Sequence, residues 1–188
     1  MNRLLYLVLL PLILSIFSTS SAQESSLAAA QPEHELLKKF VGDWRFERRS
    51  PSRNGEEPEI VGEGTVSAEL VGEFFVVARW TGEVYGNEFK AVHSLGYDVE
   101  KEKYAGSWID SIINYRWEVV GNVDEESEEL ILTSSGPGPA GGTAEFRERN
   151  QFHSAHSISI VGEMRKDDGW VNIVNTELTR QPKSDSDQ

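Results

Sequence analysis

The feature that most constrains this chain is the alternation of apolar and polar side chains that runs from Trp44 to Arg180. Trp44 and Phe46 alternate with charged residues, and the same period of two returns in segments 65–70, 89–98 and 174–180. Successive side chains of a β-strand point to opposite faces, so this period predicts strands with one buried face. We therefore expect about eight to ten short strands.

The links between these segments indicate how the strands connect. Asn54–Gly55, Gly86–Asn87 and Asp168–Gly169 are hairpin turn signals, and only segment 136–142 reads as a long flexible connection. Short links between consecutive strands predict an antiparallel up-and-down sheet, and closure into a β-barrel would remove its two exposed edges. The segment from Phe74 to Trp80 is apolar at both parities, which predicts a central strand or a strand covered on both faces.

One short helix is predicted before the first strand. Pro32 suits a first helical turn, and the apolar residues from Leu36 to Val41 fall on one helical face. Gly42 is suited to a left-handed C-terminal cap.

The N-terminal segment predicts export. Arg3 is followed by an apolar run from Leu4 to Phe17 and by small residues up to Ala22. The run is shorter than the roughly 20 residues that span a bilayer, so we expect a cleaved signal peptide at 1–22. We further expect a disordered spacer at 23–31, a barrel domain at 32–181 and a disordered tail at 182–188. The mature protein would then be periplasmic or extracellular, without stable membrane insertion.

Composition excludes several classes of function. The formal net charge is −13 and the chain has no cysteine. The acidity argues against nucleic acid as a partner, and the lack of thiols excludes disulfides and thiolate chemistry. We find no spaced ligand motif for a metal, and no haem ligand is selected at His153 or His156, so no metal and no cofactor are predicted. The oligomeric state is left open.

Two sets of residues carry family resemblances. Val41-Gly42-Asp43-Trp44, with Thr179-Arg180, resembles the Gly-x-Trp signature of lipocalins and the wider calycin group. That resemblance implies a barrel closed at one end by Gly42, Trp44 and Arg180, with the guanidinium stacked on the indole. A longer series resembles the family called domain of unknown function 1579 over residues 32–180, and it implies a calycin-like barrel with no assigned activity. Its segments are 32–37, 41–44, 95–98, 106–111 and 179–180.

Polar residues in phase with the apolar face are the candidate site. In a closed barrel they point inward together with aromatic residues and form a possible ligand site. The ligand-binding candidates are His93, Tyr97, Trp108, Asp110, Tyr115, Trp117, Glu148 and Asn150. The alternative is an internal network in which Arg48 balances Glu148 and Asp110.

Three functions remain open at this point. The first is an exported barrel that binds a small, partly apolar molecule. The second is a structural or interaction barrel with a filled core, favoured by an interior cavity below about 300 Å³. The third is an enzyme that uses His93, Asp110 or Glu148 as general acid or base, although no catalytic motif supports it.

Overall fold

The structure is a computed structural model that describes residues 29–167 and 169–182. In this part of the chain one short helix precedes ten strands. The expectations for residues 1–28, Asp168 and residues 183–188 lie outside the described residues. The elements are η1 (Pro32–Lys39), β1 (Gly42–Arg49), β2 (Ile60–Val71), β3 (Phe75–Val84), β4 (Asn87–Asp98), β5 (Lys103–Asp110), β6 (Trp117–Val123), β7 (Leu130–Pro137), β8 (Thr143–Ser154), β9 (Ser157–Lys166) and β10 (Gly169–Arg180).

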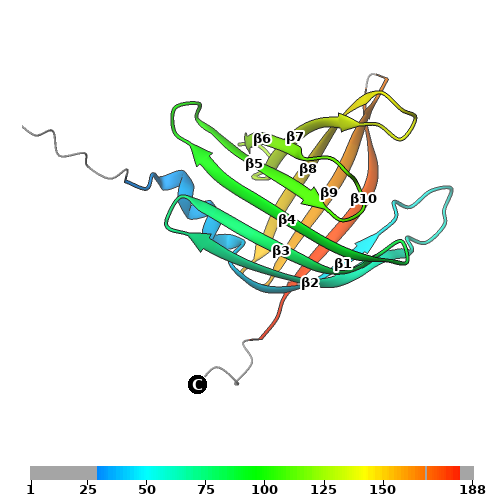
Figure 1. Cartoon of the computed structure of the whole chain (residues 1–188), viewed down its shortest axis with the longest axis horizontal. Coiled ribbons are helices and arrows are strands. Elements are labelled where there is room, and N and C mark those ends of the chain that lie inside the picture. The colour runs from blue at the N-terminus through cyan, green and yellow to red at the C-terminus, as the bar shows by residue number, and fades with distance from the viewer. Residues whose placement is uncertain (1–28, 168, 183–188) are drawn as a thin grey trace, which may run out of the picture.

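The strands form one closed antiparallel barrel (Figure 1). Each strand pairs with its neighbours in sequence, and β1 pairs with β10 to close the sheet. The closing ladder sets Trp44 opposite Arg180 and Arg48 opposite Thr176. The predicted fold class, an up-and-down barrel with one short N-terminal helix, is confirmed.

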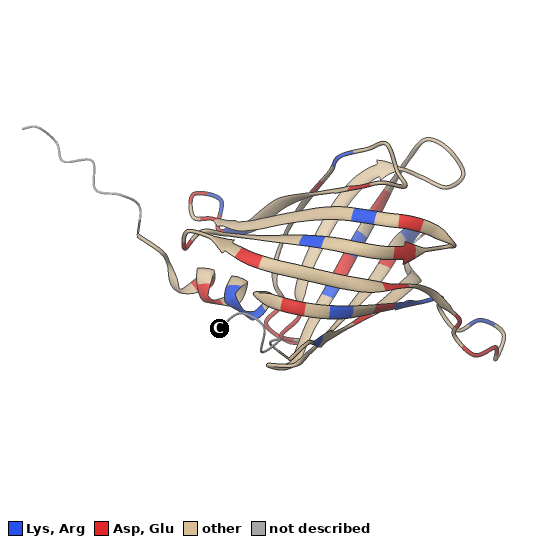
Figure 2. Cartoon of the chain, turned by 60° about the horizontal axis from the view of Figure 1, so that its bottom comes forward, with Lys and Arg blue, Asp and Glu red and all other residues tan. Residues whose placement is uncertain are grey.

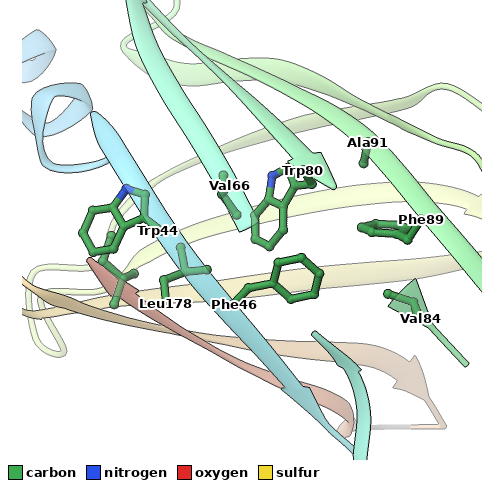
Figure 3. Packing of buried hydrophobic residues seen from close by; sticks show 9 residues of the cluster. Trp44, Phe46, Val66, Trp80, Val84, Phe89, Ala91 and Leu178 are labelled. Atoms are coloured by element: carbon green, nitrogen blue, oxygen red, sulfur yellow. The ribbon is translucent and has the colours of Figure 1, made fainter. Parts of the chain in front are cut away.

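The alternate apolar side chains of each strand face the barrel interior. Phe46 and Leu178 are opposite each other in the β1–β10 ladder and are almost fully buried. The rings of Phe46, Trp80 and Phe89 are turned toward one another inside the barrel (Figure 3), with 5.2 Å between the ring centroids of Phe46 and Trp80. Burial of such aromatic side chains is the main stabilising contribution that this alternation provides.

Helix η1 covers one end of the barrel, which we call the covered end. Leu37 of η1 is fully buried and packs in the same cluster as Leu95 and Tyr104. The hydroxyl of Tyr104 donates a hydrogen bond to the backbone carbonyl of Glu33 over 2.8 Å. The helix is therefore tied to the barrel by both apolar packing and a hydrogen bond.

Trp44 and Arg180 form a stacked pair at the covered end. Trp44 is buried and donates its indole Nε1–H to the carbonyl of Phe40 over 2.8 Å. The Arg180 guanidinium carbon lies 4.0 Å from the centroid of the indole, and its Nη1 donates to the carbonyl of Val41 over 2.6 Å. Gly42 has φ +126°, and a Cβ there would lie 2.1 Å from Arg180 Nη1, so this position requires glycine.

Three local expectations are wrong in detail. Helix η1 is a 3-10 helix that ends before Phe40, and Gly42 is the first residue of β1 rather than a helix cap. The turn between β3 and β4 has its positive φ angles at Tyr85 and Gly86, one residue earlier than predicted. Strand β3 is central, since it pairs with both β2 and β4, but the alternative of a strand covered on both faces is wrong, because Phe75 is 51% exposed.

The outer face carries most of the charged residues, with Arg48 and Glu148 among the exceptions. Acidic and basic positions are interspersed along the strands (Figure 2), and many form exposed ion pairs such as Arg45 with Glu63. Such pairs contribute little to stability. In residues 29–167 and 169–182, no helix is long and apolar enough to cross a membrane.

Candidate functional site

The barrel encloses a small cavity, which we call the inner chamber. Its volume is about 50 Å³. Aromatic side chains form much of its wall, including those of Phe40, Trp44, Trp80 and Trp108. Its polar lining residues are Arg48, His93, Glu148, Asn150 and Thr176.

The strand register explains why these polar side chains have room inside. Arg48 of β1 is opposite Gly62 of β2, and Glu148 of β8 is opposite Gly162 of β9. His93 of β4 is opposite Ala78 of β3. Each long polar side chain thus lies beside a residue with little or no side chain, and the space left over becomes the inner chamber.

Arg48 is an inward-facing cation with few protein partners. In the described part of the chain, its only hydrogen bond is from Nε to Thr176 Oγ1, over 3.4 Å. Its guanidinium carbon also lies 5.5 Å from the centroid of the Phe89 ring. Burial lowers the pKa of Arg48, and the charge of Glu148 raises it in part. A guanidinium has five N–H donors, so most of those of Arg48 have no acceptor among the described residues.

Glu148 and His93 are both desolvated. Burial raises the pKa of Glu148, and Arg48 lowers it in part. Burial lowers the pKa of His93 to about 4, so the imidazole is neutral at neutral pH. By accessible area the two side chains are only partly buried, because some of their surface borders the inner chamber rather than bulk water.

Two nitrogen atoms at the inner chamber lack a hydrogen-bond partner in the described residues. They are Nε1 of Trp80 and Nε2 of His93. By contrast, the indole of Trp108 donates to Asp110 Oδ2 over 2.8 Å, and that of Trp44 donates to the Phe40 carbonyl. A buried polar nitrogen without a partner is costly, and both of these nitrogens belong to residues that line the chamber, although neither atom is itself solvent-accessible.

The structure brings together half of the predicted ligand-binding candidates. His93, Trp108, Glu148 and Asn150 line the inner chamber. Asn150 also donates its amide to the carbonyl of Leu130 over 3.1 Å, which fixes its orientation.

The other four candidates lie elsewhere. Tyr97 packs edge to face against His34 and Tyr104 near the covered end. Asp110 accepts hydrogen bonds from Trp108 and from the amides of the β5–β6 loop, so it orders that loop instead of pairing with Arg48. In the internal network predicted as an alternative, Asp110 therefore makes no hydrogen bond or ion pair with Arg48 within the described residues, although its negative charge raises the pKa of Arg48 in part.

Tyr115 and Trp117 lie at the opposite end of the barrel from η1. Their rings pack edge to face with centroids 5.0 Å apart, and Trp117 packs in the same way on Phe146. Tyr115 also borders an open groove of about 520 Å³ that runs past Arg116, Thr133 and Trp170. This groove is open to bulk solvent, unlike the inner chamber.

The sequence analysis missed Trp80 and Thr176 as site residues. Trp80 lies in a segment that is apolar at both odd and even positions. The sequence therefore did not indicate which of its side chains face the barrel interior. Thr176 is in phase with Val174 and Leu178 and is 3% exposed. Its polarity within an inward apolar series is the signal that could have identified it.

The inner chamber does not have the composition of a metal centre. Within the described residues, no group of three or more His, Asp and Glu side chains is placed to hold a metal ion. The chamber instead combines a cation, a carboxyl group and a neutral imidazole with aromatic walls.

A closed, up-and-down barrel with an interior polar site defines a calycin-like class of protein. Within that class, a family model matches residues 29–180, and the chain belongs to the family described as protein of unknown function (DUF1579). The predicted family resemblance is confirmed. A search of curated proteins finds no match.

Two solved structures are similar to the chain. The S-type phycobiliprotein lyase CPES from Guillardia theta is 16% identical with a TM-score of 0.54, over 81% of this chain and 94% of the lyase. Rv2717c from M. tuberculosis is 14% identical with a TM-score of 0.55, over 82% of this chain and 100% of Rv2717c. At these identities the similarities support the barrel fold.

Proposed function

We propose that this protein binds a small, partly apolar molecule inside its barrel, in the inner chamber. The observation that carries the proposal is the polar lining of one aromatic-walled cavity in the described part of the chain, where Arg48 has a single long hydrogen bond and lies with Glu148 and His93. The barrel of a phycobiliprotein lyase, which shares the fold, makes a ligand-handling role reasonable for this architecture.

The volume of the chamber limits the size of the ligand. A water molecule needs about 10–15 Å³ of such space. A chamber of about 50 Å³ therefore accommodates a ligand of a few non-hydrogen atoms. Sites for drug-sized ligands measure roughly 300–1,000 Å³, so a larger molecule would need the aromatic walls to move.

The indole N–H signals offer a direct test. Proton–nitrogen NMR spectra would be recorded while acetamide, acetate, propan-2-ol and dimethyl sulfoxide are added separately. We expect at least one of these probes to shift the indole signal of Trp80, whose N–H has no acceptor among the described residues, more than those of Trp44 and Trp108, whose N–H groups are already bonded. Equal small shifts in all three signals for every probe would contradict the proposal.

A pair of variants separates chamber binding from surface effects. Ala78 lines the inner chamber, and Ala78→Leu should fill it and abolish the probe-induced shift of Trp80. Val77 is the adjacent residue on β3 with its side chain on the outer parity, so Val77→Leu is the matched control and should leave the shift unchanged. Circular dichroism would verify that both variants fold. If Ala78→Leu binds the probe as the parent does, the site lies elsewhere.

A structural barrel with a filled core is the second candidate function. The volume of about 50 Å³ favours it, because most of the interior is occupied by the protein's own side chains. Under this alternative the chamber holds only water, and none of the four probes shifts the Trp80 indole signal.

Export belongs to the proposal and rests on the sequence of residues 1–22. We expect the protein, expressed in its native host, to have the mass of a chain that begins at Gln23 and to be recovered outside the cytoplasm. Cell fractionation followed by intact-mass measurement of the purified protein checks both. A full-length chain in the cytoplasmic fraction would contradict export and would leave the chamber proposal intact.

A further inference from the structure

The inner chamber contains one cation that the protein leaves largely unbonded. Arg48 has a single long hydrogen bond, to Thr176, and makes no ion pair within the described residues. Burial lowers the pKa of Arg48 most, and among neighbouring charges Glu148 raises it most, followed by Tyr85 and Asp110. Because a desolvated guanidinium without an anion is costly, the arrangement favours a bound group that supplies acceptors and negative charge.

The donors around the chamber fit a carboxylate. The Arg48 guanidinium is planar and can bond both oxygens of a carboxylate. Trp80 is 5% exposed and offers a further N–H that no described residue accepts. The wall beside these donors is apolar, with Ala78 and Trp108, and suits a short alkyl group.

The carboxyl group of Glu148 determines how an anion can enter. With Glu148 ionised, Arg48 and Glu148 already sum to zero charge, and an added anion would leave the chamber net negative. If Glu148 takes up a proton as the anion enters, the chamber stays neutral. His93, the other titratable group that lines the chamber, is neutral at neutral pH and leaves this balance unchanged.

We propose that the inner chamber binds a short-chain monocarboxylate on Arg48 and Trp80, together with one proton on Glu148. The site therefore takes up one carboxylate ion and one proton. Together they have the composition of the neutral acid, but they bind to different groups. This inference rests on the proposed function and specifies the ligand class. No covalent bond forms or breaks other than the O–H bond of Glu148, and solvent supplies the proton.

Acetate and acetamide form the decisive pair of probes, because they have nearly the same shape and differ in charge. We expect acetate to bind at least about tenfold more tightly than acetamide, as charge-assisted hydrogen bonds to Arg48 are stronger. Calorimetry in two buffers of different ionisation enthalpy should show uptake of one proton per acetate. At pH values above the pKa of Glu148, acetate affinity should fall about tenfold per pH unit.

Two variants test the roles of the charged residues. Glu148→Gln removes the titrating carboxyl group, and we expect tighter acetate binding with no proton uptake and no dependence on pH near neutrality. Arg48→Gln should weaken acetate binding about 10- to 100-fold and leave acetamide binding nearly unchanged. Arg48→Lys keeps the charge and should restore part of the affinity. The wild-type proton-uptake measurement remains decisive if a variant fails to fold.

The outcomes distinguish the two proposals. Preference for acetamide over acetate overturns the carboxylate assignment and leaves chamber binding in place. Acetate binding without proton uptake overturns the role of Glu148. If neither probe shifts the Trp80 indole signal, and propan-2-ol and dimethyl sulfoxide also fail, the proposed function itself falls.

Discussion

His93 is a neutral histidine inside the barrel, and this state has a measurable consequence for stability. Burial lowers its pKa from 6.5 to about 4 in the folded protein. Between these two values the unfolded chain binds a proton that the folded protein does not, so protonation favours unfolding. The contribution of His93 is fully present above pH 6.5 and is lost as the pH falls toward 4.

We therefore predict that His93→Gln flattens the acid side of the stability profile. Relative to the variant, the parent protein should lose about 3 kcal/mol of unfolding free energy between pH 6.5 and 4. Urea denaturation of both proteins across this range measures the difference. Comparison with the variant cancels the contribution of the carboxyl groups to the pH dependence of stability. Glu148 is one of these groups, and its raised pKa makes the folded protein more stable as the pH falls. Parallel profiles for the two proteins would show that His93 titrates normally.

At the scale of single residues, the sequence predicted which side chains face the barrel interior better than it predicted which groups those side chains contact. Alternation placed His93, Glu148 and Asn150 on the inner face, and they line the inner chamber. It also placed Asp110 there, but the side chain turns to the loop amides of Ile112 and Ile113. The rotamer of Asp110 and the conformation of the loop decide that contact. The alternation of residues along a strand carries no information on either.

At the scale of elements, paired glycines let neighbouring strands approach closely. Gly64 of β2 is opposite Gly82 of β3. A Cβ at Gly64 would lie 2.2 Å from the carbonyl oxygen of Thr81 and 2.7 Å from the ring of Phe46. Both obstacles belong to the barrel wall or its core, so neither can easily move.

We predict that Gly64→Ala destabilises the protein by about 1–3 kcal/mol, because overpacking outweighs the small gain from a less flexible unfolded chain. Gly169→Ala is the matched control, since no described atom lies within 4 Å of the place that its added methyl group would take and its backbone needs no positive φ. Denaturant unfolding of the two variants provides the comparison. Equal stability of both would show that the β2–β3 ladder relaxes around the added methyl group.

Element boundaries were less predictable than element type. The turn between β3 and β4 is shifted by one residue because Tyr85, rather than Asn87, takes the positive φ beside Gly86. The amide of Tyr85 donates to the carbonyl of Val61 over 2.7 Å, and this contact with β2 fixes the turn position. A partner from a different hairpin is not visible in a local turn signal.

At the scale of the whole molecule, closure depends on one ladder between distant parts of the chain. Strand β10 is bonded to β1 on one side and to β9 on the other. Closure was predictable because an open sheet would expose two edges. The volume of the inner chamber was not predictable, since it depends on how side chains from all the strands share the interior.

We predict that a chain truncated after Asp167, which lacks β10, forms soluble aggregates or precipitates, because the edges of β1 and β9 are then unpaired. A chain truncated after Gln181 retains the complete β1–β10 ladder and is the control, expected to remain monodisperse. Size-exclusion chromatography with light scattering distinguishes them. A monodisperse protein without β10 would show that the remaining strands close by themselves.

The pairing of the first strand with the last also sets the order of events during synthesis. While the ribosome is still adding β10, β1 has no second neighbour, and the wall cannot be sealed until residue 180 has emerged. A nascent chain of this connectivity therefore cannot complete its barrel before β10 is available to pair with β1.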